Sequence, residues 1–310
     1  MSAITSSNVA QAIVKLVASE ALAPLVGKLV FGNLVNRDYE PVLAQAGDTV
    51  NVPIPPTLVA NNIAEAGSVQ TQNPNLGNAQ IVLNTHCEAT FQIPDVTKVL
   101  AVPDLVKTYM QPAIIAIATK IETDIASLYS LFTYNTPTGG SSAMDEARVD
   151  KAETTLFNAL VPQDAVKSMV VSGNAYSELR QLSRFTDYQT VGPSGQPSAQ
   201  ITGVLPGGGS INADGKIKDF LVFRSQYVQK PSSTTYNLAF AKDAIGLVIR
   251  RLPMPLPGTG AIAEYAEMGN FGLRVVMSYQ PNTLAQQFTV DVLYGAAVLR
   301  NNFGVQVQSD

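Results

Sequence analysis

Charged residues are scarce in this sequence of 310 residues, since lysine, arginine, aspartate and glutamate make up only 14% of it, whereas an average soluble domain carries about 25%. Long apolar runs are also lacking: no uninterrupted stretch of about 18 apolar residues occurs, so a membrane span does not explain the low charge. Lys15 and Glu20 interrupt the first apolar residues, and no signal peptide is predicted. We therefore expect other protein chains to cover much of the surface, as in an assembly subunit.

Cysteine and histidine occur once each, as Cys87 and His86. A single cysteine excludes a disulfide framework and a cysteine-based zinc site, and a single histidine excludes a multi-histidine metal centre. The net charge of −4 and the isoelectric point of about 5.1 argue against a sequence-specific reader of duplex DNA, because such proteins are usually basic. Lipidation signals are not found either. The sequence predicts no metal ion and no cofactor.

One long amphipathic helix is predicted over residues 103–133, because apolar side chains recur there at spacings of three and four through about seven turns. The stripe consists of Val106, Met110, Ile114, Ile117, Ile121, Ile125, Leu128 and Phe132. Pro112 lies inside this helix and is expected to kink it. Further helices are predicted at 8–31, 143–161 and 174–182.

A pair of alternating segments predicts an unusually long ribbon of two strands. Thr49–Ile54 alternates between apolar and polar residues, residues 55–79 are rich in proline, asparagine and glycine, and Gln80–Ile93 alternates over fourteen positions. A strand of that length spans about 46 Å at ~3.3 Å per residue. Shorter strands are predicted at the following places: 166–172, 219–228, 236–241, and a hairpin of 272–279 with 286–294. A glycine-rich loop over 190–216 and a proline-rich connector over 252–260 separate some of them.

The ribbon has an apolar face that needs a partner, formed by Ile81, Leu83, Phe91 and Ile93. A two-stranded ribbon is marginally stable by itself, and its length exceeds what a compact domain with a radius of gyration of about 20 Å can cover. We expect it to dock on a neighbouring copy of the chain. The alternative is a long hairpin folded back on its own chain.

Charge is unevenly distributed along the chain. Residues 38–97 contain no lysine or arginine but six carboxylates, so that the rest of the chain carries a net charge of about +2. The six are Asp38, Glu40, Asp48, Glu65, Glu88 and Asp95. An acidic arm on a slightly basic body gives complementarity for joining copies; the alternative is an ordinary solvated acidic face.

The order of these elements resembles a known family. Gly47–Pro53 (GDTVNVP) opens the ribbon, Phe91–Asp95 (FQIPD) leads from it into the long helix, and Leu238–Ile245 (LAFAKDAI) and Val290–Leu299 (VDVLYGAAVL) follow. In this ordered set the chain resembles, over essentially its whole length, the major capsid proteins of tailed double-stranded-DNA bacteriophages, which have the Hong Kong 97-type fold.

The resemblance implies an α+β fold with named parts. These are an N-terminal arm (1–47), an extended loop forming the ribbon (48–95), a peripheral domain (96–160) with a spine helix at 103–133, an axial domain (161–251), and return strands of the peripheral domain (252–310). It implies a non-enzymatic protein that self-assembles as hexamers and pentamers into an icosahedral shell around a double-stranded DNA genome. Its place would be the virion capsid, assembled in the host cytoplasm. No membrane partner is implied.

Further partners follow from the same resemblance: a scaffolding protein, a portal, a decoration protein, and DNA contacted without sequence specificity. Two departures from the family matter. Residues 38–97 contain no lysine, so the extended loop cannot supply the lysine of the isopeptide bond that welds some shells. Fewer than fifty residues precede the ribbon, which favours a separate scaffolding protein over a fused one.

Other functions find little support. The same fold also serves bacterial nanocompartment (encapsulin-type) shells that package a protein cargo, and an enzyme of unknown type is a third alternative. His86 and Cys87 are strand neighbours, so their side chains should point to opposite faces and form no catalytic dyad.

Candidate phosphate and DNA sites are weak as well. Gly258–Ala263 (GTGAIA) matches a loose dinucleotide motif but follows a proline-rich connector, and the glycines at 207–209 lack a following lysine. Four scattered lysines support at most weak, salt-sensitive phosphate contact. They are Lys15, Lys28, Lys107 and Lys120. No catalytic, cofactor-binding or metal-binding residue is predicted.

Overall fold

The computed structural model describes most of the chain from residue 29 onward. The described residues are 29–39, 49–56, 58–63, 65, 67–69, 71–73, 77–96, 105–136, 143–182, 202–204, 210–212, 215–256, 259–268 and 271–310. All but residues 29–31 of the predicted helix over 8–31, and most of the predicted loop over 190–216, lie outside them; within that loop, β6 (Thr202–Val204) and β7 (Ser210–Asn212) form a small antiparallel pair.

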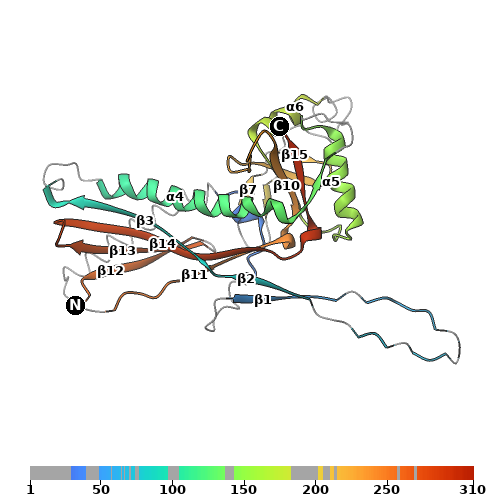
Figure 1. Ribbon diagram of the computed structural model, residues 1–310, viewed down its shortest axis with the longest axis horizontal. Helices are drawn as coiled ribbons and strands as arrows, with labels where there is room; N and C mark the ends of the chain where they lie inside the picture. Colours follow the sequence, from blue (N-terminus) through green and yellow to red (C-terminus); the bar gives the residue numbers. More distant parts are fainter. Residues whose placement is uncertain are drawn as a thin grey trace.

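A long antiparallel sheet forms one half of the molecule (Figure 1). Its strands are β3 (Thr85–Pro94), β11 (Ile245–Arg250), β12 (Ala261–Met268), β13 (Phe271–Gln280) and β14 (Ala285–Val298). The fourteen-residue strand β14 is central, since it pairs with β3, β11 and β13. The predicted hairpin of 272–279 with 286–294 is thereby confirmed.

The predicted long helix lies along this sheet as α4 (Leu105–Ser127), followed by the 3₁₀ turn η2 (Leu128–Leu131). Its apolar stripe is in the core: Met110, Ile114, Ile117, Ile121 and Ile125 are at most 1% exposed. The helix continues through Pro112 without a break. The spacing of three and four residues therefore predicted both the helix and its buried face.

A six-stranded mixed sheet forms the other half. In sheet order its strands are β4 (Thr133–Asn135), β15 (Gly304–Ser309), β10 (Thr235–Ala241), β5 (Lys167–Val171), β9 (Phe220–Arg224) and β8 (Gly215–Ile217). Helices α5 (Glu146–Asn158) and α6 (Gly173–Gln181) accompany it, and they begin at the capping side chains of Asp145 and Ser172. One hydrophobic core runs through both halves.

Short segments join the two halves. The helix α2 (Phe31–Leu34) is buried against α4, and the 3₁₀ turns η3 (Lys242–Ala244) and η4 (Asn301–Phe303) each connect a strand of one sheet with a strand of the other. As a result, β15 lies in the six-stranded sheet and β11 in the long sheet. The predicted boundary at residue 251 instead grouped β11 with the strands of residues 161–251, and β15 with the hairpin strands of residues 252–310.

The prediction of one unbroken strand over Gln80–Ile93 is wrong. The segment forms two strands, β2 (Gly77–Val82) and β3, which pair with different partners: β2 with β1 (Thr49–Ile54), and β3 with β14. Because two residues, Leu83 and Asn84, separate the strands, the alternation of faces continues across the break. A period of two therefore does not reveal the break.

Candidate functional site: the projecting ribbon and its root

The chemical candidates from the sequence do not assemble into a catalytic site. Cys87 faces the core under α4, and burial raises the pKa of its thiol, which disfavours the reactive thiolate. The neighbouring His86 is on the opposite, exposed face, as predicted. Gly260, with a positive φ, leads into the strand β12 rather than into a helix, so Gly258–Ala263 lacks the context of a dinucleotide site.

The basic and glycine-rich candidates add no site. Lys120 forms an ion pair with Asp124 on the next turn of α4, with 2.5 Å between Nζ and Oδ1. Lys15, Lys28 and the glycines at 207–209 lie outside the described residues, and the side chain of Lys107 is not described. Within the described part of the chain, no three histidine, cysteine or acidic side chains come together as metal ligands, and no helix there is long and apolar enough to cross a membrane.

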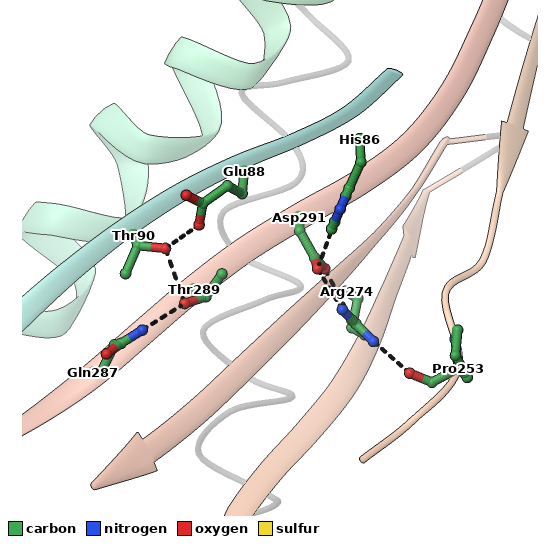
Figure 2. A network of polar contacts seen from close by, with 8 residues as sticks. All are labelled: His86, Glu88, Thr90, Pro253, Arg274, Gln287, Thr289 and Asp291. Carbon is green, nitrogen blue, oxygen red and sulfur yellow. Dashed lines mark hydrogen bonds and ion pairs between the residues drawn. The ribbon is translucent and has the colours of Figure 1, made fainter. Parts of the chain in front are cut away.

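A polar network that the sequence analysis missed holds the long sheet together on the face away from α4 (Figure 2). The nearly buried carboxylate of Asp291 accepts a hydrogen bond of 2.9 Å from Arg274 Nε and lies 3.1 Å from His86 Nε2. Arg274 also donates to the carbonyl of Pro253. Arg274 and Asp291 are directly opposite each other on β13 and β14, so a correct hairpin register would have revealed the pair.

The same face carries a row of neutral contacts. Thr90 Oγ1 is 3.0 Å from Thr289 Oγ1 (Figure 2). Farther along the strands, Gln92 Nε2 donates to Gln287 Oε1 at 3.3 Å. Together with Asp291, these contacts join β3 to β14. The part of the predicted ribbon beyond Asn84 is thus a built-in strand of the body and not a free arm.

The ribbon that does project consists of β1 and β2 (Figure 1). Its root, formed by Val50, Val52, Ile81 and Leu83, packs on Val248 and Leu299 in a small second core. Ile81 is fully buried there, and Ile93 and Phe91 pack within the main core. The prediction that Ile81, Leu83, Phe91 and Ile93 need a neighbouring copy is wrong, because β11, β14 and α4 of the same chain cover them.

Two glycines allow the root to sit so close to the body. A Cβ on Gly295 of β14 would collide with the backbone carbonyl of Val82, and one on Gly246 of β11 would lie 2.7 Å from Ile81 Cδ1. The collision at Gly295 involves backbone, which cannot rotate away. The absence of a side chain at Gly295 therefore sets where the ribbon leaves the body.

We expect Gly295→Ala to lower the free energy of unfolding by about 1–3 kcal/mol, the usual cost of an overpacked site. Urea unfolding of the subunit measures this. Gly215→Ala is the matched control, because nothing lies within 4 Å of a Cβ at Gly215; its midpoint should stay near that of the wild type. Equal midpoints for the two variants would contradict the role assigned to Gly295.

Beyond the root, the described residues between 55 and 73 belong to a tip loop that extends away from the body (Figure 1). Every described residue from 58 to 73 is exposed. The side-chain amide of Gln72 accepts from Val59 N at 3.0 Å and donates to Val59 O, so it ties the two legs of the loop together. Four large apolar side chains remain in solvent: Leu58 (66% exposed), Val59 (68%), Ile63 (54%) and Val69 (78%).

Comparison with known proteins places this geometry in a known fold. No family model and no curated protein sequence matches the chain. Solved structures do: one of Mycobacterium phage Che8 (18% identity, TM-score 0.64, 90% of each chain covered) and the capsid structure of cyanophage P-SCSP1u (11%, 0.61, 91% of this chain and 88% of that one). The capsid of Ralstonia phage GP4 also matches (11%, 0.57, 91% of each).

The chain has the Hong Kong 97-type capsid fold. The α+β fold class predicted from the sequence is confirmed. The candidate functional site is therefore an interaction surface, the tip loop, held at a fixed place on the body by its root.

Proposed function

We propose that this chain is a structural, non-enzymatic major capsid protein that self-assembles into an icosahedral shell enclosing double-stranded DNA. The observation that carries the proposal is the tip loop: apolar side chains more than half exposed, on a ribbon whose root is buried in its own subunit. Exposed apolar side chains gathered on one projection are typical of an interaction site. In a capsid fold, a neighbouring copy is the natural partner.

The charge pattern of the projection favours an apolar contact between copies. Of the six carboxylates predicted for an acidic arm, only Glu65 lies on the projecting ribbon and its tip loop, which carry no lysine or arginine, so the rest of the chain has a net charge of about −3 and is not basic. A projection with so little charge suits a contact made by its exposed apolar side chains. This favours attachment of each tip loop to an apolar surface of a neighbour, as the extended loop does in the family that the sequence resembles.

The finer features of the proposal follow from that family. Copies would form hexamers and pentamers, assembled in the host cytoplasm with a separate scaffolding protein and a portal, and present in the finished virion. A decoration protein would bind outside, and the packaged DNA would be contacted without sequence specificity. The parts of the chain would be the arm (1–47), the extended loop, and the peripheral and axial domains around the long and the six-stranded sheets.

Electron microscopy of the expressed protein tests the proposal, with closed shells as the expected result. Native particles should hold nuclease-protected DNA; a protein cargo in its place would support a nanocompartment shell. A monomer or dimer in size-exclusion chromatography that turns over a substrate would contradict the proposal and support an enzyme.

A further inference from the structure

Three non-glycine residues among those the structure describes have a positive φ: Leu160 (57°), Lys218 (53°) and Leu284 (44°). Side chains with a Cβ are strained in this left-handed region, which glycine and, less readily, asparagine occupy. Such strain persists where the side chain makes a stabilising contact that offsets it. That contact can lie within the subunit or with a neighbouring molecule.

For Lys218 the contact lies within the subunit. It lies in the turn between β8 and β9, and its ammonium group forms ion pairs with Asp150 and, at 3.8 Å, with Glu146. Both partners belong to α5. The side chain thus ties the edge of the six-stranded sheet to a helix.

Leu160 has no such contact to explain it. It follows the end of α5 at the position where helices commonly end with glycine: Leu160 N donates to Phe157 O at 3.0 Å and Val161 N donates to Leu156 O at 3.3 Å. These bonds involve backbone alone, and glycine would make them without strain. The leucine side chain is 84% exposed, the highest value among the large hydrophobic residues of the described chain.

Leu284 repeats this combination at the far end of the long sheet. It is the last residue of the turn between β13 and β14, and its carbonyl accepts from Asp95 N at 3.0 Å. The side chain is 62% exposed. Asp95 in turn accepts a hydrogen bond of 2.8 Å from the hydroxyl of the exposed Tyr279, and the exposed Val96 follows Asp95 in the chain. Again the backbone bond needs no side chain, and the apolar group points into solvent.

We propose that Leu160 and Leu284 are contact residues that each bury their side chain against a neighbouring copy of this chain in the assembled shell. Within one subunit each combines a strained backbone with an exposed apolar group, and both are unfavourable. Burial of the side chain on assembly removes the exposed apolar surface from water, and the free energy gained offsets the cost of the backbone strain. The inference rests on the proposed function.

We take the partner to be another copy because both side chains are apolar and the charge next to Leu284 is negative. Leu284 is hydrogen-bonded to Asp95, whose carboxylate accepts from Tyr279, so this end of the sheet does not suit a polyanion such as DNA. A second copy presents uncharged apolar side chains of its own, foremost the tip loop. An apolar contact of that kind needs no charged partner.

Leu160→Gly and Leu284→Gly test the inference. We expect each variant to keep or raise the subunit's melting temperature, because glycine relieves the strain, and to raise the protein concentration at which shells form by about tenfold, because the apolar contact is lost. The methionine variants, Leu160→Met and Leu284→Met, retain an apolar side chain and should assemble near the wild-type concentration. Sedimentation of shells and thermal unfolding of the unassembled subunit are the two measurements.

Lys218→Gly is the matched control, because it makes the same backbone change at a residue whose contacts are internal. It should lower the melting temperature and leave shell formation near the wild-type concentration. Glycine variants of both leucines that assemble like the wild type overturn this inference alone. A wild-type protein that forms no shells overturns the proposed function and this inference with it.

Discussion

Replacing residues 58–72 with a short glycine–serine linker is expected to abolish shell formation while the subunit still folds. The replaced segment contains the four exposed apolar side chains of the tip loop. It leaves β1, β2 and the buried root intact. A short linker can join the remaining ends, because the two legs lie close together near the ends of the replaced segment, where Gln72 hydrogen-bonds to Val59 in the wild type.

A variant that preserves the loop's length distinguishes the effect of losing the apolar side chains from the effect of shortening the loop. Changing Leu58, Val59, Ile63 and Val69 to serine removes apolar groups worth about 1.5 kcal/mol or more each when fully buried. In a shell, where every copy makes the contact, this loss should prevent assembly at any practical protein concentration.

Asn62→Ser combined with Thr71→Ser is the control, since it changes two exposed polar residues of the same loop; this variant should assemble normally. Electron microscopy detects shells, and thermal unfolding of the subunit should give similar midpoints for all three variants and the wild type. Normal shells from the quadruple serine variant would show that the tip loop is not an assembly contact.

The sequence predicted elements whose periodicity is local. The stripe from Met110 to Ile125 lies in the core as expected, because one face of a helix recurs at 3.6 residues whatever covers it. The strand β12 was missed, since the alanine- and glutamate-rich run Ala261–Met268 has little intrinsic strand preference. Its place in the sheet comes from pairing with β13 along its whole length, which is a tertiary effect.

The candidate site shows the same division between local pattern and tertiary partner. Alternation identified Ile81 as a buried position but gave no information on what buries it, and the covering strands β11 and β14 follow more than 150 residues later. The tip loop could be recognised from its proline, asparagine and glycine content. The ribbon divides at Leu83 and Asn84 into a part that pairs with the body and a part that projects from it. The alternation of apolar and polar residues continues across this break, so the sequence did not show which part projects.

A second large effect is expected from a carboxylate in the core. Glu122 of α4 is fully buried and accepts hydrogen bonds from the backbone of α2, from Phe31 N at 3.0 Å and from Gly32 N at 2.9 Å. Burial raises the pKa of this carboxyl to about 7, although the backbone donors oppose that shift. Glu122 thus fastens the segment that precedes the ribbon to the spine helix.

The raised pKa links stability to pH. Between the ordinary pKa of 4.5 and the folded-state pKa of about 7, the folded protein binds more protons at Glu122 than the unfolded chain does. The contribution of Glu122 is therefore fully present below pH 4.5 and is lost as the pH rises through about 7. At 1.36 kcal/mol per pKa unit, the loss is about 3 kcal/mol.

Glu122→Gln should remove this part of the pH dependence, because the amide carries no charge at any pH. Urea unfolding of the unassembled subunit at pH 5 and pH 8 measures it: the difference between the two free energies of unfolding should shrink by roughly 2–3 kcal/mol relative to the wild type, because most of the full loss falls between these two pH values. Glu65→Gln, on the exposed tip loop, should keep the wild-type difference. An unchanged difference in Glu122→Gln would mean that Glu122 is not protonated in this range, and the α2–α4 contact would then be held by an ionised carboxylate whose backbone donors outweigh its burial.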